Sequence, residues 1–323
     1  MQLKPFFDSI SQNAAQLTYG ESPVELYEPI RYIMSLGGKR LRPIFTLLTA
    51  NLFTDDWQKA IKPALAVEVF HNFTLMHDDI MDKAPLRRGM ATVHEKWNAN
   101  IAILSGDVML VNAYELLLDI DKNILPDVLR RFNRTAAEVC EGQQLDMNFE
   151  TLENISKGEY IEMIRLKTSV LLGFAMELGA ILVGADSIIT KQLYDAGVCY
   201  GLGFQLTDDL LDVYGDPVKF GKQVGGDIIS NKKTYLLLDA LEKAKDENKL
   251  KLLNWISKSE FDKAEKVKQV TQIFTDLEVD KTTKKLIKQY FDAGFEILND
   301  LDLDSERKKL LIDFIESLAQ RES

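Results

Sequence analysis

Two short acidic motifs contain the side chains in this sequence that are best suited to chemistry. The pattern Asp-Asp-x-x-Asp occurs at residues 78–82 and again at residues 208–212. Each motif follows an apolar run, and on a helix its first and last aspartates share one face. Carboxylates of like charge at this spacing repel each other, so a partly buried pair needs a cation. The predicted metal ligands are Asp78, Asp82, Asp208 and Asp212.

The ligand types indicate which metal would bind. Oxygen ligands shared with a phosphate suit Mg²⁺ better than zinc. Zinc is one alternative, because His71, His77 and His94 lie close together in the sequence. No cysteine lies near them, and the catalytic-zinc spacing His-Glu-x-x-His does not occur there, so we favour Mg²⁺. A solvated acidic face is the other alternative for an acidic cluster taken alone.

Basic residues lie close to the first acidic motif. Residues 37–43 read Gly-Gly-Lys-Arg-Leu-Arg-Pro, and Arg87 and Arg88 follow the motif. Both groups could grip phosphate oxygens, arginine through its bidentate fork. Residues 215–233 contain several glycines among cations, which suggests a mobile loop that closes over phosphates. An ordinary exposed loop is the alternative reading of that segment.

Bulk properties narrow the functional class. The chain has 323 residues, 46% of them hydrophobic, and no linker-like composition shift, so we expect a single domain over residues 1–323. The net charge of −11 argues against nucleic-acid binding. The N-terminus does not resemble a secretory signal, and Cys140 and Cys199 suit a reducing compartment, so we expect a cytoplasmic location.

Apolar residues recur at intervals of three and four through most of the chain, which predicts an all-α fold. We expect about a dozen helices around a central cavity, because bundles form ligand sites from side chains on facing helices. The apolar stretch 169–185 is broken by Glu177 and is too short for a clean membrane span, so we expect a buried core helix and no transmembrane segment. The longest predicted helices cover residues 61–84, 98–120, 124–149, 157–184 and 188–214.

The motif series resembles the all-trans prenyl diphosphate synthases, with an isoprenoid synthase fold. The resemblance covers residues 36–233 and is carried by residues 37–43, His71, the two acidic motifs, residues 87–89, Gly-Gln-x-x-Asp at 142–146, Lys167-Thr168, Gln205, Lys222 and Lys232. It implies a Mg²⁺-dependent prenyltransferase with three ions. Such an enzyme ionises an allylic diphosphate (dimethylallyl, geranyl or farnesyl), condenses it with isopentenyl diphosphate and eliminates a proton. A homodimer is also implied.

The resemblance assigns expected roles to individual residues. The residues expected to bind isopentenyl diphosphate are Lys39, Arg42, His71 and Arg88. Those expected to hold the allylic diphosphate with the metals are Arg87, Lys167, Lys222 and Lys232. Those expected to line the allylic site are Gln143, Asp146 and Gln205, with Thr168 and the Lys167 backbone near the cation. The expected principal metal ligands are Asp78, Asp82 and Asp208, with Asp212 assisting.

Product length in this family depends on side chains one to two turns before the first acidic motif. Here these are Phe70, Phe73 and Thr74, and core packing is the alternative role for a phenylalanine on a helix. The pattern resembles short-chain enzymes, so we expect geranylgeranyl or farnesyl diphosphate as the product. The remaining alternatives are a class I terpene cyclase and a non-catalytic partner subunit of the same fold. The second acidic motif and residues 37–43 argue against a cyclase.

Overall fold

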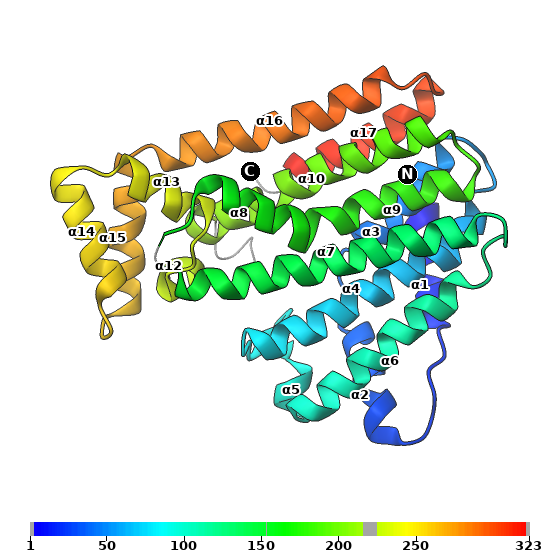
Figure 1. Ribbon diagram of the computed structural model, residues 1–323, viewed down its shortest axis with the longest axis horizontal. Coiled ribbons are helices and arrows are strands. Elements are labelled where there is room, and N and C mark those ends of the chain that lie inside the picture. The colour runs from blue at the N-terminus through cyan, green and yellow to red at the C-terminus, as the bar shows by residue number, and fades with distance from the viewer. Residues whose placement is uncertain (1–2, 153, 216–224, 321–323) are drawn as a thin grey trace. The chain divides into compact units, whose positions relative to one another are not determined.

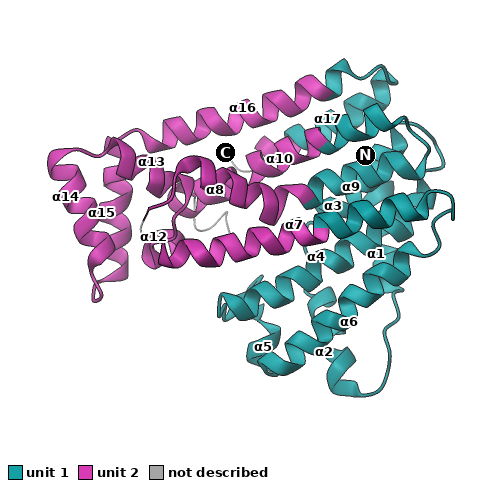
Figure 2. Ribbon diagram, viewed as in Figure 1, with its two compact units in different colours: residues 1–135, 171–194, 298–316 teal, residues 136–170, 195–297, 317–323 magenta. Residues whose placement is uncertain are grey.

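The computed structural model describes residues 3–152, 154–215 and 225–320. Within these residues almost all regular structure is helical, and the two strands are very short (Figure 1). The prediction of an all-α fold is therefore confirmed. The chain divides into two compact units: unit 1, with residues 1–135, 171–194 and 298–316, and unit 2, with residues 136–170, 195–297 and 317–323 (Figure 2).

Unit 1 is organised around a long helix, α4 (Ile61–Met81), whose residues 63–70 are all buried. Because this half of the helix is packed in the core, it holds in place the half that bears the first acidic motif. A short hairpin follows, in which Arg87 pairs with Met90. The other elements that lie wholly in unit 1 are α1 (Lys4–Ala15), α2 (Val24–Ser35), α3 (Leu41–Asn51), η1 (Trp57–Ala60), β1 (Leu86–Arg87), β2 (Met90–Ala91), α5 (Val93–Lys96) and α6 (Ala99–Leu117).

Helix α9 (Val170–Leu182) is the buried apolar helix that the sequence predicts. Its one charged residue, Glu177, is 4% exposed and accepts a hydrogen bond from Arg131 of α7 (Leu125–Thr151). Arg131 also donates to Asp127 at 2.9 Å. A buried carboxylate is tolerated only when it is paired, and Arg131 provides that partner.

Unit 2 contains α8 (Lys157–Ile164) and an unusual turn that follows it, and α9 continues the helix into unit 1. The structure divides the segment predicted as a helix over 157–184 into α8, η2 (Arg165–Ser169) and α9, and η2 is a π-helical turn. Ser156 and Glu159 form a capping box that fixes the start of α8. The other elements that lie wholly in unit 2 are α12 (Gly226–Ser230), α13 (Tyr235–Lys243), α14 (Asp246–Ser257) and α15 (Lys263–Asp276).

Several helices contribute residues to both units. Helices α7, α10 (Ser187–Tyr214) and α16 (Val279–Asp300) each continue from one unit into the other, and α17 (Ser305–Gln320) ends the described chain. Helices α4, α6, α7 and α10 match the long helices predicted over 61–84, 98–120, 124–149 and 188–214 to within a few residues. Helical periodicity therefore located them correctly.

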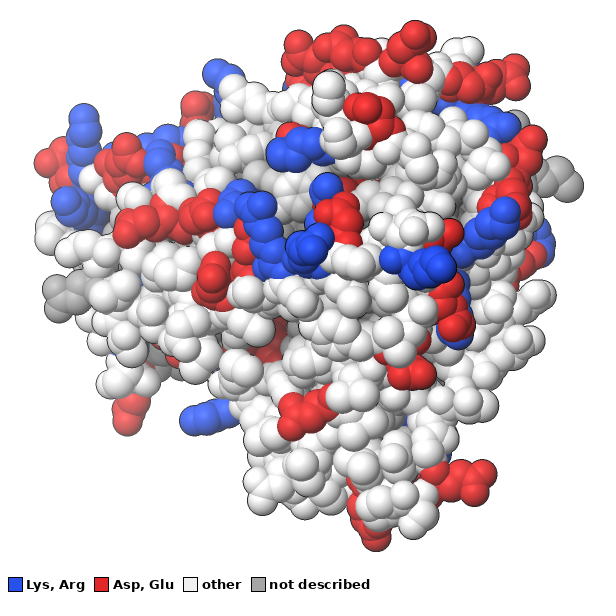
Figure 3. All heavy atoms as spheres, turned by 45° about the vertical axis from the view of Figure 1, so that its right-hand side comes forward, with Lys and Arg blue, Asp and Glu red and all other residues white. Residues whose placement is uncertain are grey.

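Helix α6 exposes an apolar stripe. Leu104, Val111 and Leu118 follow one another at seven-residue spacing, and each is more than half exposed. By length and composition α6 is the one described helix that could cross a membrane, and only 33% of that window is buried. The face in Figure 3 shows basic atoms interspersed with acidic ones rather than one continuous basic patch.

Candidate active site

The first acidic motif lies at the C-terminal end of α4, in unit 1. Its middle aspartate, Asp79, is 2% exposed, whereas Asp82 is exposed and Asp78 is half-buried. The Arg87 guanidinium binds both oxygens of Asp79, with Nε 2.8 Å from Oδ2 and Nη2 2.6 Å from Oδ1. Burial raises the pKa of Asp79, and Arg87 opposes that rise. This bidentate pair fixes the direction of Arg87 relative to the motif.

A basic cluster surrounds His71, which lies two turns before Asp78 on the same helix. Arg42 of α3 contacts His71 of α4, with Arg42 Nη1 3.0 Å from His71 Nε2. Arg88 lies over the backbone of Gly38, where an added Cβ would come within 2.8 Å of the guanidinium carbon. Gly38 has a φ of 138°, so a residue with a side chain would be both strained and obstructed there. Lys39 is exposed in the same turn.

The electrostatics of this cluster favour an anion. Burial lowers the pKa of His71 well below its ordinary value, and Arg42 and Arg88 lower it further, so the imidazole is neutral at pH 7. Glu68 faces the same arginines; burial raises its pKa and Arg42 opposes the rise. Asn72 donates a hydrogen bond of 3.2 Å to Glu68. Three arginines, Arg42, Arg88 and Arg40, thus act on the single carboxylate of Glu68, and this excess of positive charge favours a bound anion.

The residues predicted to set product length lie in an aromatic row on α4. The ring centroids of Phe70 and Phe73 are 5.6 Å apart, and those of Phe73 and His77 are 4.7 Å apart. His77 packs so closely on Gly106 of α6 that a Cβ at Gly106 would collide with the imidazole. Thr74 donates its hydroxyl to a backbone carbonyl of the preceding turn, at 2.8 Å. Phe73 is therefore held by rings on both sides.

Two glycines make room for the π-helical turn that carries Lys167 and Thr168. A Cβ on Gly142 of α7 would collide with the backbone nitrogen of Lys167. A Cβ on Gly201 of α10 would lie 2.6 Å from Cα of Ser169. The two neighbouring helices thus contact the turn backbone to backbone, and π-helical turns are frequent at functional sites. The glycine of the Gly-Gln-x-x-Asp motif consequently has a steric role.

Asp146 connects two of the predicted cations. Lys167 Nζ lies 2.7 Å from Asp146 Oδ2, and Lys232 Nζ lies 3.6 Å from the same oxygen. Burial alone would raise the pKa of Asp146, but Lys232 and Lys167 outweigh it and lower that pKa. Both amide atoms of Gln143 are buried without a hydrogen-bond partner among the described residues. Lys222, also predicted for this site, lies outside the described residues.

The middle aspartate of the second motif is buried in a neutral hydrogen-bond network. Asp209 is 5% exposed and accepts hydrogen bonds from the Tyr160 hydroxyl and from Gln205 Nε2, the latter at 3.0 Å. The Thr168 hydroxyl donates to Gln205 Oε1 at 3.2 Å, so the network reaches the π-helical turn. Burial, followed by the charge of Asp227, raises the pKa of Asp209 to about 7.

The outer aspartates of the second motif differ from each other. Asp208 is exposed, whereas Asp212 is partly buried and its carboxylate accepts the backbone N–H of Asp227 at 2.9 Å. The Asp212 carbonyl accepts the N–H of Gly225 at 2.5 Å. Asp212 therefore also holds the segment that begins at Gly225.

Sequence reasoning missed three residues that shape these clusters, namely Tyr160, Glu68 and Asp227. A signal was available for Tyr160, because it lies seven residues before Lys167, two helical turns away. Asp227 follows two glycines in a segment whose glycines and cations, rather than its carboxylates, indicated a function. Glu68 carried no such signal, because it lies inside an apolar run.

The types of the predicted ligands fit the predicted metal. All four predicted ligands are carboxylates, and no cluster of three or more His, Cys, Asp or Glu suited to holding a metal occurs among the described residues. Mg²⁺ is commonly bound by one or two carboxylates together with water and substrate phosphates, rather than by an all-protein cage. Carboxylate pairs near phosphate-binding cations fit that mode of binding, and they do not fit a structural zinc site.

Comparison with known proteins identifies the family. The polyprenyl synthetase family model matches residues 23–274. The chain is 37% identical over 305 residues to a geranylgeranyl diphosphate synthase of Methanosarcina mazei, covering 93% of this chain and 91% of that protein. It is 42% identical over 236 residues to a geranylgeranyl pyrophosphate synthase of Geoglobus acetivorans, covering 72% and 73% respectively.

Solved structures agree with the sequence relatives. A crystal structure of geranylgeranyl pyrophosphate synthase superposes with a TM-score of 0.94 at 44% identity, covering 99% of both chains. This likeness confirms the isoprenoid synthase fold. The family is one of Mg²⁺-dependent enzymes. The chain is therefore a transferase that belongs to the polyprenyl synthetase family.

Proposed function

We propose that this enzyme condenses isopentenyl diphosphate with an allylic diphosphate and releases a short-chain all-trans prenyl diphosphate. The observation that carries the proposal is the presence of two distinct cationic clusters. One, in unit 1, is formed by Arg42, His71 and Arg88, and the other, in unit 2, by Lys167 and Lys232. A reaction between two diphosphates needs two anion sites, whereas a terpene cyclase needs only one.

The first cluster is the proposed site for isopentenyl diphosphate, with Lys39 at its exposed edge. The second is the proposed site for the allylic diphosphate, together with Arg87 and Lys222. The ion pairs of Asp146 with Lys167 and Lys232 hold these two ammonium groups in place. Gln143 has two buried amide atoms that a polar group of the substrate could satisfy.

Asp78, Asp82 and Asp208 are the proposed principal Mg²⁺ ligands, and Asp212 assists. Three ions are proposed, by resemblance to the family. When bound, Mg²⁺ would neutralise the charge that develops on the departing diphosphate. Arg87 is directed by Asp79, and Lys167 by Asp146, to share that charge.

The bond changes follow from these placements. The allylic C–O bond breaks and leaves a carbocation, which the Thr168 hydroxyl and the amide oxygen of Gln205 would stabilise electrostatically. The double bond of isopentenyl diphosphate attacks the cation, and a new C–C bond forms. A proton then leaves, and the released diphosphate is the proposed acceptor.

Product length is proposed to depend on Phe73. Its ring packs between Phe70 and His77, so we expect it to keep its position and to limit the length of the growing prenyl chain. We expect Phe73→Ala to lengthen the product by one or more five-carbon units, measured by chromatography of the dephosphorylated products. Thr74→Ala is a control of similar position, for which we expect a smaller change. An unchanged product distribution in Phe73→Ala would show that Phe73 only packs the core.

We also propose a domain organisation, an oligomeric state and a cellular location. The chain is a single domain, because α7, α10 and α16 continue through both units and the family model spans both. It forms a homodimer, and the apolar stripe of Leu104, Val111 and Leu118 on α6 is the face that a second copy would cover. It acts in the cytoplasm.

One assay tests the function. The protein is incubated with isopentenyl diphosphate, Mg²⁺ and each of dimethylallyl, geranyl and farnesyl diphosphate, and the products are sized. We expect elongation of at least one allylic substrate and none in the presence of a chelator. Cyclic hydrocarbon formed from an allylic substrate alone would instead identify a cyclase, and absence of any condensation would indicate a non-catalytic subunit.

A further inference from the structure

Lys266 of α15 is a buried cation outside every site predicted from the sequence. The residue is 1% exposed. Its ammonium donates to Asn231 Oδ1 at 2.7 Å and to the Ile229 carbonyl at 3.2 Å, and it lies 4.1 Å from the centroid of the Phe261 ring. Burying an ammonium group costs free energy, and its hydrogen bonds only compensate for that cost. An apolar residue could fill the same space without it, so the contacts of Lys266 suggest a role beyond packing.

The contacts of Lys266 converge on the turn between α12 and α13. Asn231 ends α12 in a left-handed conformation with a φ of 55°, and the next N–H, that of Lys232, bonds back to the Asp227 carbonyl at 2.9 Å. This is the pattern of a helix C-cap. The Asn231 amide also donates to the Ile256 carbonyl at 3.0 Å. The asparagine side chain is therefore held from two sides, by α15 and by α14.

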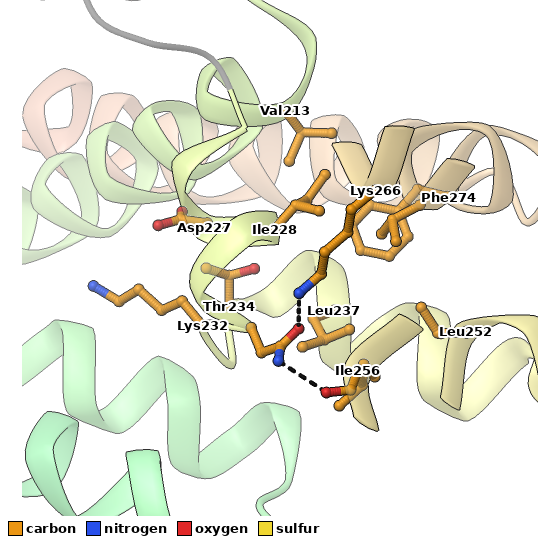
Figure 4. Close-up of a pocket in the computed structure, with 12 residues that line it drawn as sticks. Val213, Asp227, Ile228, Lys232, Thr234, Leu237, Leu252, Ile256, Lys266 and Phe274 are labelled. Atoms are coloured by element: carbon orange, nitrogen blue, oxygen red, sulfur yellow. Dashed lines mark hydrogen bonds between the residues drawn. The ribbon is translucent and has the colours of Figure 1, made fainter. Parts of the chain in front are cut away.

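The turn carries Lys232 directly after Asn231. Figure 4 shows Lys266 reaching toward this turn from one side, while the Lys232 side chain extends away on the other. The cavity between them has a volume of about 10 Å³, room for at most one water molecule, so it is not a substrate site. The hydrogen bonds of Lys266 and Asn231 instead connect the turn to α15 and α14.

The residues on either side of Lys232 are also fixed. Lys233 donates to the Phe149 carbonyl at 2.6 Å, close to the end of α7. At the start of the segment, a Cβ on Gly225 would lie 2.6 Å from a methyl group of Val267, the neighbour of Lys266 on α15. Helix α15 therefore supports the segment from 225 to 231 at two points.

We propose that Lys266 is a positioning residue that, through Asn231, directs Lys232 toward Asp146 and the allylic diphosphate. This inference rests on the proposed function, in which Lys232 contacts that substrate. The proposal predicts different effects on the two sites. Loss of the Lys266 contacts disturbs the allylic site and leaves the isopentenyl diphosphate cluster of Arg42 and His71 unchanged.

The test uses Lys266→Met, with Lys268→Met as the matched control, because Lys268 is an exposed lysine on the same helix. We expect Lys266→Met to raise KM for the allylic diphosphate about tenfold and to change KM for isopentenyl diphosphate less than twofold. Lys268→Met leaves both constants unchanged. Equal rises in both KM values, or a lower melting temperature with neither KM changed, would overturn the proposal.

A second variant guards against a general loss of stability. Asn231→Gly keeps the left-handed backbone but removes the side chain that Lys266 holds, so it should reproduce the allylic KM rise. The double variant Lys266→Met/Asn231→Gly should raise the allylic KM no more than the more severe single variant, because both changes break the same hydrogen bond. Additive effects would contradict the connection.

A third readout does not depend on activity. Brief trypsin treatment should cleave after Lys232 and Lys233 several-fold faster in Lys266→Met than in the wild type or Lys268→Met, with other sites unchanged. If the wild type fails to condense any substrate, the proposed function fails, and the cleavage rates still decide whether Lys266 anchors the turn. Equal cleavage rates at these two lysines would overturn the anchoring.

Discussion

The two acidic motifs have the same pattern but different surroundings for the middle aspartate. In unit 1, Asp79 faces the permanent charge of Arg87 through a bidentate ion pair. In unit 2, Asp209 faces two neutral donors, the Tyr160 hydroxyl and the Gln205 amide. Both aspartates are almost fully buried, whereas Asp82 and Asp208 are exposed.

The difference shows how one pattern serves two tasks. In each motif the outer aspartates are the proposed metal ligands, and the middle one contacts a residue of another element. Asp79 fixes Arg87 through a bidentate ion pair, whereas Asp209 accepts from the Tyr160 hydroxyl of α8 and from Gln205 on its own helix. Metal binding and positioning are therefore proposed for different aspartates of the same five residues.

The largest expected effect comes from the outer aspartates. Asp78→Asn and Asp208→Asn each remove the charge of a proposed metal ligand, and we expect kcat to fall roughly 10²–10³-fold, comparable to other losses of transition-state charge stabilisation. Asp302→Asn is the control, because Asp302 is exposed and lies on neither motif. Steady-state kinetics over a range of Mg²⁺ concentrations measure the effect. A change of less than threefold in either variant would remove that residue from the metal site.

A smaller and unequal effect is expected for the middle aspartates. Asp79→Asn loses a charge-assisted bidentate pair, so we expect about 1–3 kcal/mol less stability and about a tenfold rise in the allylic KM. Asp209→Asn keeps one oxygen that can accept from Gln205, and its new amide N–H can donate to the Tyr160 hydroxyl oxygen, so we expect a loss of less than about 1 kcal/mol. Urea unfolding and steady-state kinetics of both variants measure the contrast. Equal losses of stability would show that the two environments do not differ in their effect.

The smallest expected effect is a change in the pH dependence of stability, and it concerns only His71 in unit 1. The pKa of His71 is lowered on folding, so the unfolded chain binds the proton more readily, and the His71 contribution to stability falls as pH drops below about 6.5. The slope from one such group is at most about 1.4 kcal/mol per pH unit. Urea unfolding of the metal-free protein between pH 7.5 and 5.5 should therefore show a flatter dependence in His71→Gln. Parallel curves would contradict the assigned environment of His71.

Helical periodicity predicted most of the fold, because α4, α6, α7 and α10 are long and their apolar faces are regular. It also located the helical segment at 157–182, but it did not reveal the π-helical turn at 165–169, where the register changes. That turn depends on close contact with Gly142 and Gly201, which are distant in sequence, so local pattern could not reveal it. The two carboxylate pairs were predicted from residue type and spacing, whereas Arg42 and His71 were assigned to one site by resemblance to the family, and the structure places these two side chains in contact. The task of Lys266 did not, because it depends on which turn α15 supports.

The ion pair between Glu177 and Arg131 makes the two residues interdependent in evolution. Loss of Arg131 alone would leave a carboxylate that is 4% exposed without its guanidinium, which is a costly state for a buried charge. Simultaneous replacement of both by apolar residues of similar volume would avoid that cost. We therefore expect these two positions to change together rather than singly.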